Sequence, residues 1–245
     1  ETSCFGETSI NSMSSGLARP ISPSLRTGIS SPVKAPFLSN CAFACAIVYL
    51  PSSIAETYKT VFTLHRNGGP YVKFATCNEY FENWEVEDVF SYAADLGYDG
   101  VEIAPFTIAP SVEDISAQRR SKIRAAAERS GVEIVGLHWL LASPEGLYIT
   151  HPDQAIYERT KDYFRSLIQF CGDLGGQVMI IGSPMQRNLQ EGWDRTECWQ
   201  RMRGAFEASL YLAEQHGVYL CIESLSRDQT NIISTCEEAR CMVAE

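Results

Sequence analysis

The chain has 245 residues, of which 45% are hydrophobic and 20% charged, as in an ordinary globular protein with a sizeable core. Its net charge is −10, and because residues 1–70 hold five basic and three acidic side chains, the negative charge belongs to residues 71–245. Nucleic acid is therefore not an expected partner, since a phosphate backbone needs clustered Lys and Arg. No apolar run reaches the roughly 18 residues that span a bilayer, so no membrane partner is expected either.

The nine cysteines are scattered, without a CxxC pair or a regular disulfide spacing. This pattern predicts a reducing compartment, and we expect the cytoplasm. The cysteines and histidines form no zinc-binding spacing, and Cys77, Cys171 and Cys198 have no His close by in the sequence. The sequence therefore predicts neither a zinc site nor a thiol nucleophile.

Residues 1–70 show no sustained hydrophobic period and are interrupted repeatedly by proline. Residues 9–34 are rich in serine and lack acidic side chains, which is typical of an organelle transit peptide and would place the protein in an organelle. The alternative is a disordered or non-native leader. Residues 67–70 (NGGP) close this part with a turn or linker signal. We expect an irregular leader over residues 1–70 and a folded domain over residues 71–245.

Five strand–helix units follow in chain order. The first strand is expected over residues 71–77 and the first helix over residues 85–96, where apolar side chains recur at helical spacing. The later strands are expected at 100–104, 133–141, 177–181 and 218–223, and the later helices at 112–130, 153–174 and 195–216. Glycines at 97, 131, 175 and 217 mark helix ends. A capping-box pattern at residues 234–237 (STCE) begins a fifth helix.

This alternation is typical of a parallel α/β architecture. A closed (β/α)₈ TIM barrel needs about 250 residues, so residues 71–245 would supply about five of its eight units. Ending there would expose the edge of the fifth strand. The alternative is an open doubly wound sheet, but the first strand–helix turn lacks a GxGxxG phosphate loop. Long loops follow the strands, and in both architectures the site lies on that face.

Several segments carry a family resemblance. Residues 71–79 (YVKFATCNE), 97–106 (GYDGVEIAPF) and 135–141 (VGLHWLL) resemble the xylose isomerase-like TIM-barrel superfamily. Residues 174–184 (LGGQVMIIGSP) and 223–231 (ESLSRDQTN) are similar to its sugar phosphate isomerase/epimerase branch, which includes D-tagatose 3-epimerase-like and hydroxypyruvate isomerase-like enzymes. The resemblance covers residues 71–245 and implies a TIM barrel that acts on sugars.

Glu223 ends the predicted fifth strand, where the chain enters a polar loop. On its own it could be a solvated carboxylate. The resemblance implies that Glu223 is a metal ligand and one of two acid/base carboxylates. Moving a proton from the carbon beside a ketose carbonyl needs such a carboxylate, with a metal that polarises the oxygens. Hard oxygen ligands predict Mn²⁺ or Mg²⁺. The remaining ligands, an Asp, a His and a second Glu, are expected beyond residue 245.

The loop after Glu223 departs from the family pattern. Arg227, Thr230 and Asn231 match it, but Gln229 is found where family members commonly have a second Glu. Gln229 can bind a sugar hydroxyl but cannot act as a carboxylate base. We expect Arg227 and Gln229 to contact substrate, and a solvated loop charge is the alternative for Arg227.

Polar residues at other strand ends are further candidates for substrate binding. Glu102 lies inside the apolar second strand, where an unpaired carboxylate is costly, so we expect it to face the barrel mouth. His138 lies in the apolar run of the third predicted strand; the resemblance implies that it lines the substrate pocket, whereas the residues alone favour a core histidine. Ser183, Gln186 and Arg187 follow the fourth strand and could bind hydroxyls or a phosphate, Arg being well shaped for phosphate. The alternative is a polar loop over the rim.

These observations predict a metal-dependent isomerase or epimerase that acts on a ketose or sugar phosphate by enediolate-type proton transfer. The expected partner is a small sugar or sugar phosphate, and a homo-oligomer is an open alternative to a monomer. We expect the 245-residue chain alone to have little or no activity. Two other functions stay open: a non-catalytic sugar-binding or degenerate member, and an abasic-site endonuclease-like enzyme of the same superfamily.

Overall fold

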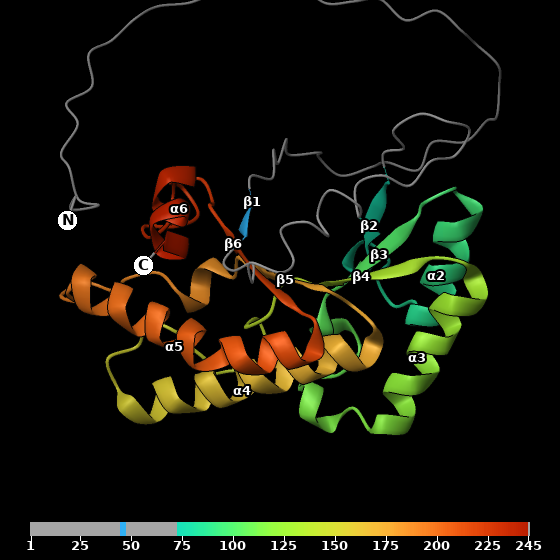
Figure 1. The fold of residues 1–245 in the computed structure, drawn as a ribbon, viewed down its shortest axis with the longest axis horizontal. Helices are drawn as coiled ribbons and strands as arrows, with labels where there is room; N and C mark the ends of the chain where they lie inside the picture. The colour runs from blue at the N-terminus through green and yellow to red at the C-terminus, as the bar shows by residue number, and fades with distance from the viewer. Residues whose placement is uncertain (1–44, 48–72, 245) are drawn as a thin grey trace, which may run out of the picture. The chain divides into compact units, whose positions relative to one another are not determined.

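The computed structural model describes residues 45–47 and 73–244 (Figure 1). The predicted leader therefore lies outside the described residues, apart from a three-residue strand, β1 (Cys45–Ile47), which the sequence did not predict. The five predicted strands are present as β2 (Ala75–Cys77), β3 (Gly100–Ile103), β4 (Glu133–Leu137), β5 (Val178–Ile181) and β6 (Tyr219–Glu223). The predicted helices are present as α2 (Val86–Asp95), α3 (Ala117–Ser130), α4 (Gln154–Leu174), α5 (Arg195–His216) and α6 (Cys236–Ala244).

The strands form one sheet in the order β1-β6-β5-β4-β3-β2. Neighbours from β2 to β6 are parallel and consecutive in the chain. Successive helices also pack on one another, α2 on α3, α3 on α4 and α4 on α5 (Figure 1). A doubly wound sheet reverses its strand order at a switch point, whereas a barrel winds in one direction. The fold is a partial β/α barrel, and the doubly wound alternative is wrong.

The outer edge of β6 is paired with β1 in antiparallel orientation, with Cys45 opposite Glu223 and Ile47 opposite Cys221. The expectation of an exposed edge after the fifth parallel strand is therefore wrong along these residues. A pairing across more than 170 residues of chain leaves no local pattern in the sequence. The antiparallel strand lies directly beside the strand that ends at Glu223.

Local capping explains the helix boundaries. The Asp153 side chain accepts hydrogen bonds from two backbone N–H groups at the start of α4, and the Asp194 side chain accepts one, from the N–H of Glu197, at the start of α5. The predicted helix over 112–130 is divided, because Ser116 caps α3 through the N–H of Arg119 and leaves a separate 3₁₀ turn at Val112–Asp114. The capping box of α6 lies one residue later than predicted: Thr235 accepts from the N–H of Glu238.

Side-chain alternation along the strands separates the core from the barrel interior. Val101 and Ile103 of β3 are fully buried, while Glu102 between them is half-buried and points to the opposite face. The core lies between the sheet and the helices and includes Phe90 of α2 and Phe164 of α4. Glu102 therefore belongs to the face that the helices do not cover.

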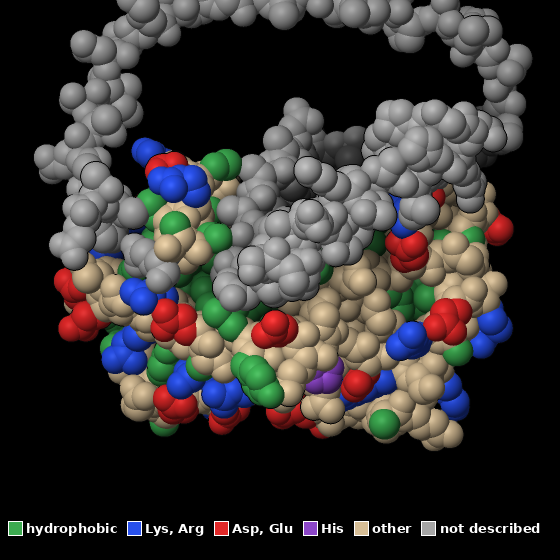
Figure 2. All heavy atoms as spheres, viewed as in Figure 1, with side chains coloured by type: hydrophobic (Ala, Val, Ile, Leu, Met, Phe, Trp, Pro, Cys, Tyr) green, Lys and Arg blue, Asp and Glu red, His purple; other side chains and the backbone are tan. Residues whose placement is uncertain are grey.

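The charges on the visible face of the described residues are mixed. Figure 2 shows basic and acidic side chains interspersed there, without a continuous basic patch on that part of the chain. None of the helices described is both long and apolar enough to cross a bilayer. The charge pattern of the described fold agrees with the acidic composition of residues 71–245.

Candidate active site

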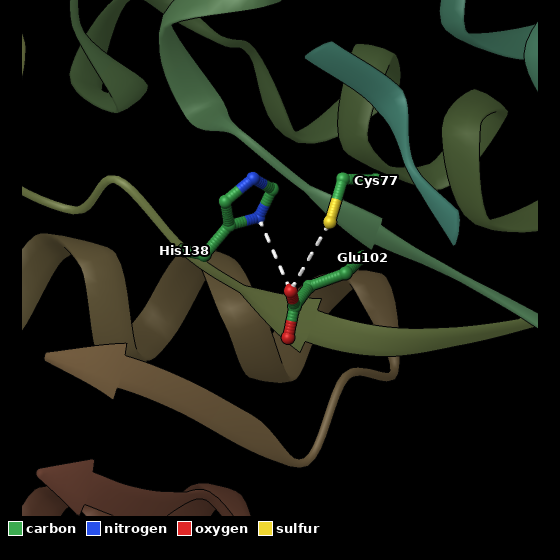
Figure 3. A group of neighbouring side chains, drawn as sticks. All are labelled: Cys77, Glu102 and His138. Carbon is green, nitrogen blue, oxygen red and sulfur yellow. Dashed lines mark hydrogen bonds and ion pairs between the residues drawn. The ribbon is translucent and has the colours of Figure 1, made fainter. Parts of the chain in front are cut away.

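A cluster of polar side chains lies at the carboxyl ends of three neighbouring strands (Figure 3). Cys77 is the last residue of β2, Glu102 is near the end of β3, and His138 directly follows β4. Parallel pairing places Cys77 opposite Glu102. The strand register therefore brings together three residues that are far apart in the sequence.

Glu102 is at the centre of this cluster. Its Oε2 atom lies 3.6 Å from Cys77 Sγ and 3.5 Å from His138 Nδ1 (Figure 3). The three potential ligand atoms all lie within 4.8 Å of one another. The cluster combines sulfur, oxygen and nitrogen atoms, so it can bind a cation or exchange protons.

Glu79 fixes the orientation of the His138 ring. Its carboxylate contacts Nε2 of His138. A carboxylate only accepts hydrogen bonds, so Nε2 carries a proton, and when the ring is neutral Nδ1 keeps a lone pair. Nδ1 is buried and has no hydrogen-bond partner among the described residues. The ring therefore presents an unsatisfied acceptor to Glu102.

Cys77 is a thiol in this environment. Burial raises the pKa of Cys77 above its ordinary value, and the carboxylates of Glu102 and Glu79 raise it further. The free thiolate is the nucleophilic form, so Cys77 is a poor nucleophile here unless a cation offsets this negative charge.

Glu223 ends β6 on the same face of the sheet. Burial raises the pKa of Glu223; the charge of Arg187 lowers it, Glu102 raises it, and His138 lowers it. Glu223 is therefore coupled electrostatically to the cluster on β2, β3 and β4. Its carboxylate fits over Gly182, where an added Cβ atom would lie 2.2 Å from Glu223 Oε2. A glycine at the end of β5 leaves the space that this carboxylate occupies.

Arg187 is buried behind Glu223 and binds backbone rather than solvent. Its Nη1 donates to the carbonyls of Ile181, at 3.0 Å, and of Glu223, at 2.9 Å, and its Nη2 contacts the carbonyl of Ile233 at 3.5 Å. Burial lowers the pKa of Arg187 to about 10, while Glu223 and Glu238 act in the opposite direction. The guanidinium joins the ends of β5 and β6 to the turn before α6.

The other residues proposed from the sequence lie in loops. The hydroxyl of Ser183 is buried and accepts a hydrogen bond from the N–H of Leu141 at 3.3 Å. Gln186 is in a 3₁₀ turn, and its carbonyl accepts from the N–H of Ile149. Arg227 and Gln229 are exposed after β6, where Ser226 donates to the Gln229 side chain at 3.0 Å. Their roles in substrate binding stay predictions.

The structure brings Glu102 and His138 together, couples Glu223 to them electrostatically, and adds Cys77 and Glu79 to the cluster. Cys77 lies in one cluster with His138, so the expectation that it has no His partner is wrong. Glu79 contacts the same ring. Their position at the end of the first predicted strand could have pointed to both residues, since the ends of parallel strands converge on one edge of the sheet.

Comparison with known proteins identifies relatives for most of the described chain. The family model described as "Xylose isomerase-like TIM barrel" matches residues 90–245. A D-psicose 3-epimerase of Ruminiclostridium cellulolyticum is 25% identical over 169 residues, which cover 65% of this chain and 55% of that protein. The chain thus spans about half the length of this curated relative.

Solved structures share the fold at lower identity. D-psicose 3-epimerase with D-tagatose from Clostridium cellulolyticum gives a TM-score of 0.59 at 19% identity, covering 70% of this chain and 60% of that chain. L-ribulose 3-epimerase gives 0.59 at 19% identity, with 71% and 57% covered. The 3-keto-D-glucoside 4-epimerase of E. coli gives 0.58 at 15% identity, with 71% and 64% covered.

Proposed function

The chain belongs to the xylose isomerase-like TIM barrel family, and from this premise we propose that it forms part of an isomerase or epimerase acting on a ketose or a sugar phosphate. The printed names of the relatives support a sugar substrate, since they are epimerases of sugars. The observation that carries the proposal is the position of Glu223, a half-buried carboxylate at a strand end that is coupled electrostatically to Glu102 and His138.

Glu223 is the residue proposed to move the proton. Epimerisation beside a carbonyl removes a proton from one face of the carbon and returns a proton on the other face, so it needs one acid/base group on each face, and Glu223 is proposed as one of the two. Burial is the largest influence and raises the pKa of Glu223; Arg187 and His138 act against this rise, and Glu102 adds to it. Arg187 donates a hydrogen bond to the backbone carbonyl of Glu223, and the Glu223 carboxylate lies over Gly182.

A divalent metal fits this site only with further ligands. Glu223 offers a half-buried carboxylate, an oxygen donor that suits Mn²⁺ or Mg²⁺. One carboxylate does not hold such an ion, and we expect the other ligands on later strands, as the family resemblance implies. When bound, the metal would polarise the carbonyl and stabilise the enediolate charge of the sugar. Glu102 and His138 would line the neighbouring wall of the substrate pocket.

An assay of the complete gene product tests this proposal. Purified protein with Mn²⁺ is incubated with D-psicose, D-fructose, D-tagatose and L-ribulose, and the products are separated by chromatography. Glu223→Gln is expected to lower turnover by roughly 10²- to 10⁴-fold. The matched control, Glu214→Gln on the exposed face of α5, is expected to have normal turnover. Equal turnover in Glu223→Gln and Glu214→Gln would refute the role of Glu223.

A further inference from the structure

We propose that Cys77, Glu102 and His138 form a binding site for a borderline-soft divalent cation of the zinc class, with Glu79 orienting His138. This site is separate from the oxygen-ligand metal proposed at Glu223 and does not rest on sugar chemistry. Its ligand atoms come from the ends of β2, β3 and β4 (Figure 3).

The orientation of the His138 ring suits Nδ1 to bind a cation. Glu79 holds the Nε2 side of the ring, so the lone pair of Nδ1 points into the cluster. In metal sites a ligating His almost always donates its other ring N–H to a carboxylate, carbonyl or water, which fixes the tautomer and strengthens the ligand. Glu79 and His138 reproduce this arrangement. The buried Nδ1 has no hydrogen-bond partner in the described structure, and a cation would supply what it lacks.

The ligand distances agree with tetrahedral zinc. With Zn–S of about 2.3 Å and Zn–O or Zn–N of about 2.0 Å, tetrahedral geometry separates sulfur from oxygen by about 3.5 Å and nitrogen from oxygen by about 3.3 Å. The observed separations from Glu102 Oε2 are 3.6 Å to Cys77 Sγ and 3.5 Å to His138 Nδ1. Cys77 Sγ and His138 Nδ1 lie within 4.8 Å of each other, and binding of the ion would bring them to about 3.5 Å.

The ligand types set the choice of metal. Thiolate and imidazole ligands favour Zn²⁺, whereas Mg²⁺ and Mn²⁺ favour sets made of oxygen. Three protein ligands leave a fourth position for water or another ligand, as in zinc sites that are open to small molecules. That position lies on the face of the sheet that the helices leave uncovered. A cation there would also compensate the negative charge of Glu102 and Glu79.

The competing arrangement is a protonated His138 held between two carboxylates, Glu79 at Nε2 and Glu102 at Nδ1. It satisfies both ring nitrogens without a metal and gives Cys77 no role beyond a weak contact with Glu102. The two arrangements differ in whether the sulfur of Cys77 bonds to a metal. Cobalt spectroscopy measures that bond directly.

The first experiment titrates the metal-free 245-residue chain with Co²⁺ as a spectroscopic probe and then adds Zn²⁺. A near-ultraviolet sulfur-to-cobalt charge-transfer band is expected, and Zn²⁺ is expected to remove it. Cys77→Ser is expected to lose the band, while the control Cys236→Ser, whose thiol is exposed, is expected to retain it. Glu79→Gln is expected to weaken Co²⁺ binding by roughly 10- to 100-fold. Absence of the band, or its persistence in Cys77→Ser, would overturn the proposal.

The second experiment needs no substitution, so it does not depend on how a variant folds. The chain is alkylated with iodoacetamide with and without Zn²⁺, for a time long enough to label the poorly nucleophilic Cys77 in the metal-free chain, and each cysteine is followed by mass spectrometry. Zn²⁺ is expected to slow labelling of Cys77 and to leave labelling of Cys236 unchanged. Equal labelling of Cys77 in both conditions would refute the site. Both readouts are independent of epimerase activity, so failure of the function proposed above would not change them.

Discussion

The carboxylate of Glu223 occupies the space above Gly182 that any other side chain would fill. A Cβ atom at position 182 would lie 2.2 Å from Glu223 Oε2, well inside contact distance. The atom in its way is the end of a flexible side chain, so an added methyl group would displace the carboxylate rather than the backbone. The end of β5 therefore sets where the proposed acid/base group of β6 lies.

Gly182→Ala is expected to reduce activity of the complete gene product by about 10²-fold, because a misplacement of about 1 Å at a reacting group has that effect. The midpoint of thermal unfolding is expected to change little. Gly204→Ala in α5 is the matched control, since its Cβ atom would meet only Tyr157 Oη at 3.2 Å. An active Gly182→Ala variant would contradict the geometry proposed for Glu223.

Arg187→Met is expected to lower the free energy of unfolding by about 2–4 kcal/mol, since it removes the Arg187 donor from the carbonyls of Ile181 and Glu223. Urea denaturation of the 245-residue chain measures this loss. Arg165→Met is the control, because its pair with Asp162 is exposed and contributes at most about 0.5 kcal/mol. Equal stability of the two variants would show that Arg187 does not hold the strand ends together.

Helix boundaries were predictable where local signals act alone. The bounds predicted for α5, 195–216, agree with the structure because Asp194 caps its start and Gly217 ends it in the left-handed conformation. The start of α3 was missed because Ser116 lies within a continuous helical pattern and its capping role depends on the turn before it. The pairing of β1 with β6 depends on contacts between distant segments.

The site was also predictable only in part, because local sequence patterns show single residues but not the contacts between distant strands. Glu223 could be proposed because it ends an apolar run, and Glu102 and His138 because each is a polar residue within an apolar strand pattern. The contact of Glu102 with Cys77 depends on the register of β2 against β3, which the sequence does not specify. Arg187 looked like a candidate for phosphate binding, and its backbone contacts become visible only once β5, β6 and the Ile233 turn are assembled.

The ion pair between Glu87 of α2 and Arg119 of α3 makes the stability of the contact between these helices depend on pH. The hydrogen bond from Arg119, 3.0 Å from Nη2 to Oε2, lowers the pKa of Glu87. A lowered pKa contributes stability above the ordinary carboxyl value, and this stability is lost as pH falls through the pKa of the folded state. Glu87→Gln is expected to cost about 0.5–1 kcal/mol at pH 7, because solvent screens the pair. The difference from the unmodified chain is expected to disappear in acid.

Urea denaturation at pH 7 and in acid measures this dependence. Glu85→Gln is the control, because Glu85 meets the same guanidinium at 3.4 Å and is largely exposed. A cost of Glu87→Gln that does not change between neutral and acidic solution would show that the contribution is not electrostatic.

The most direct test of the central claim is solvent deuterium exchange. The complete gene product is incubated in deuterium oxide with Mn²⁺ and D-psicose, and deuterium at the carbon beside the carbonyl is followed by NMR. We predict that deuterium enters this carbon, and that Glu223→Gln abolishes the exchange while Glu214→Gln retains it. Exchange that continues undiminished in Glu223→Gln would contradict the claim that Glu223 moves the proton.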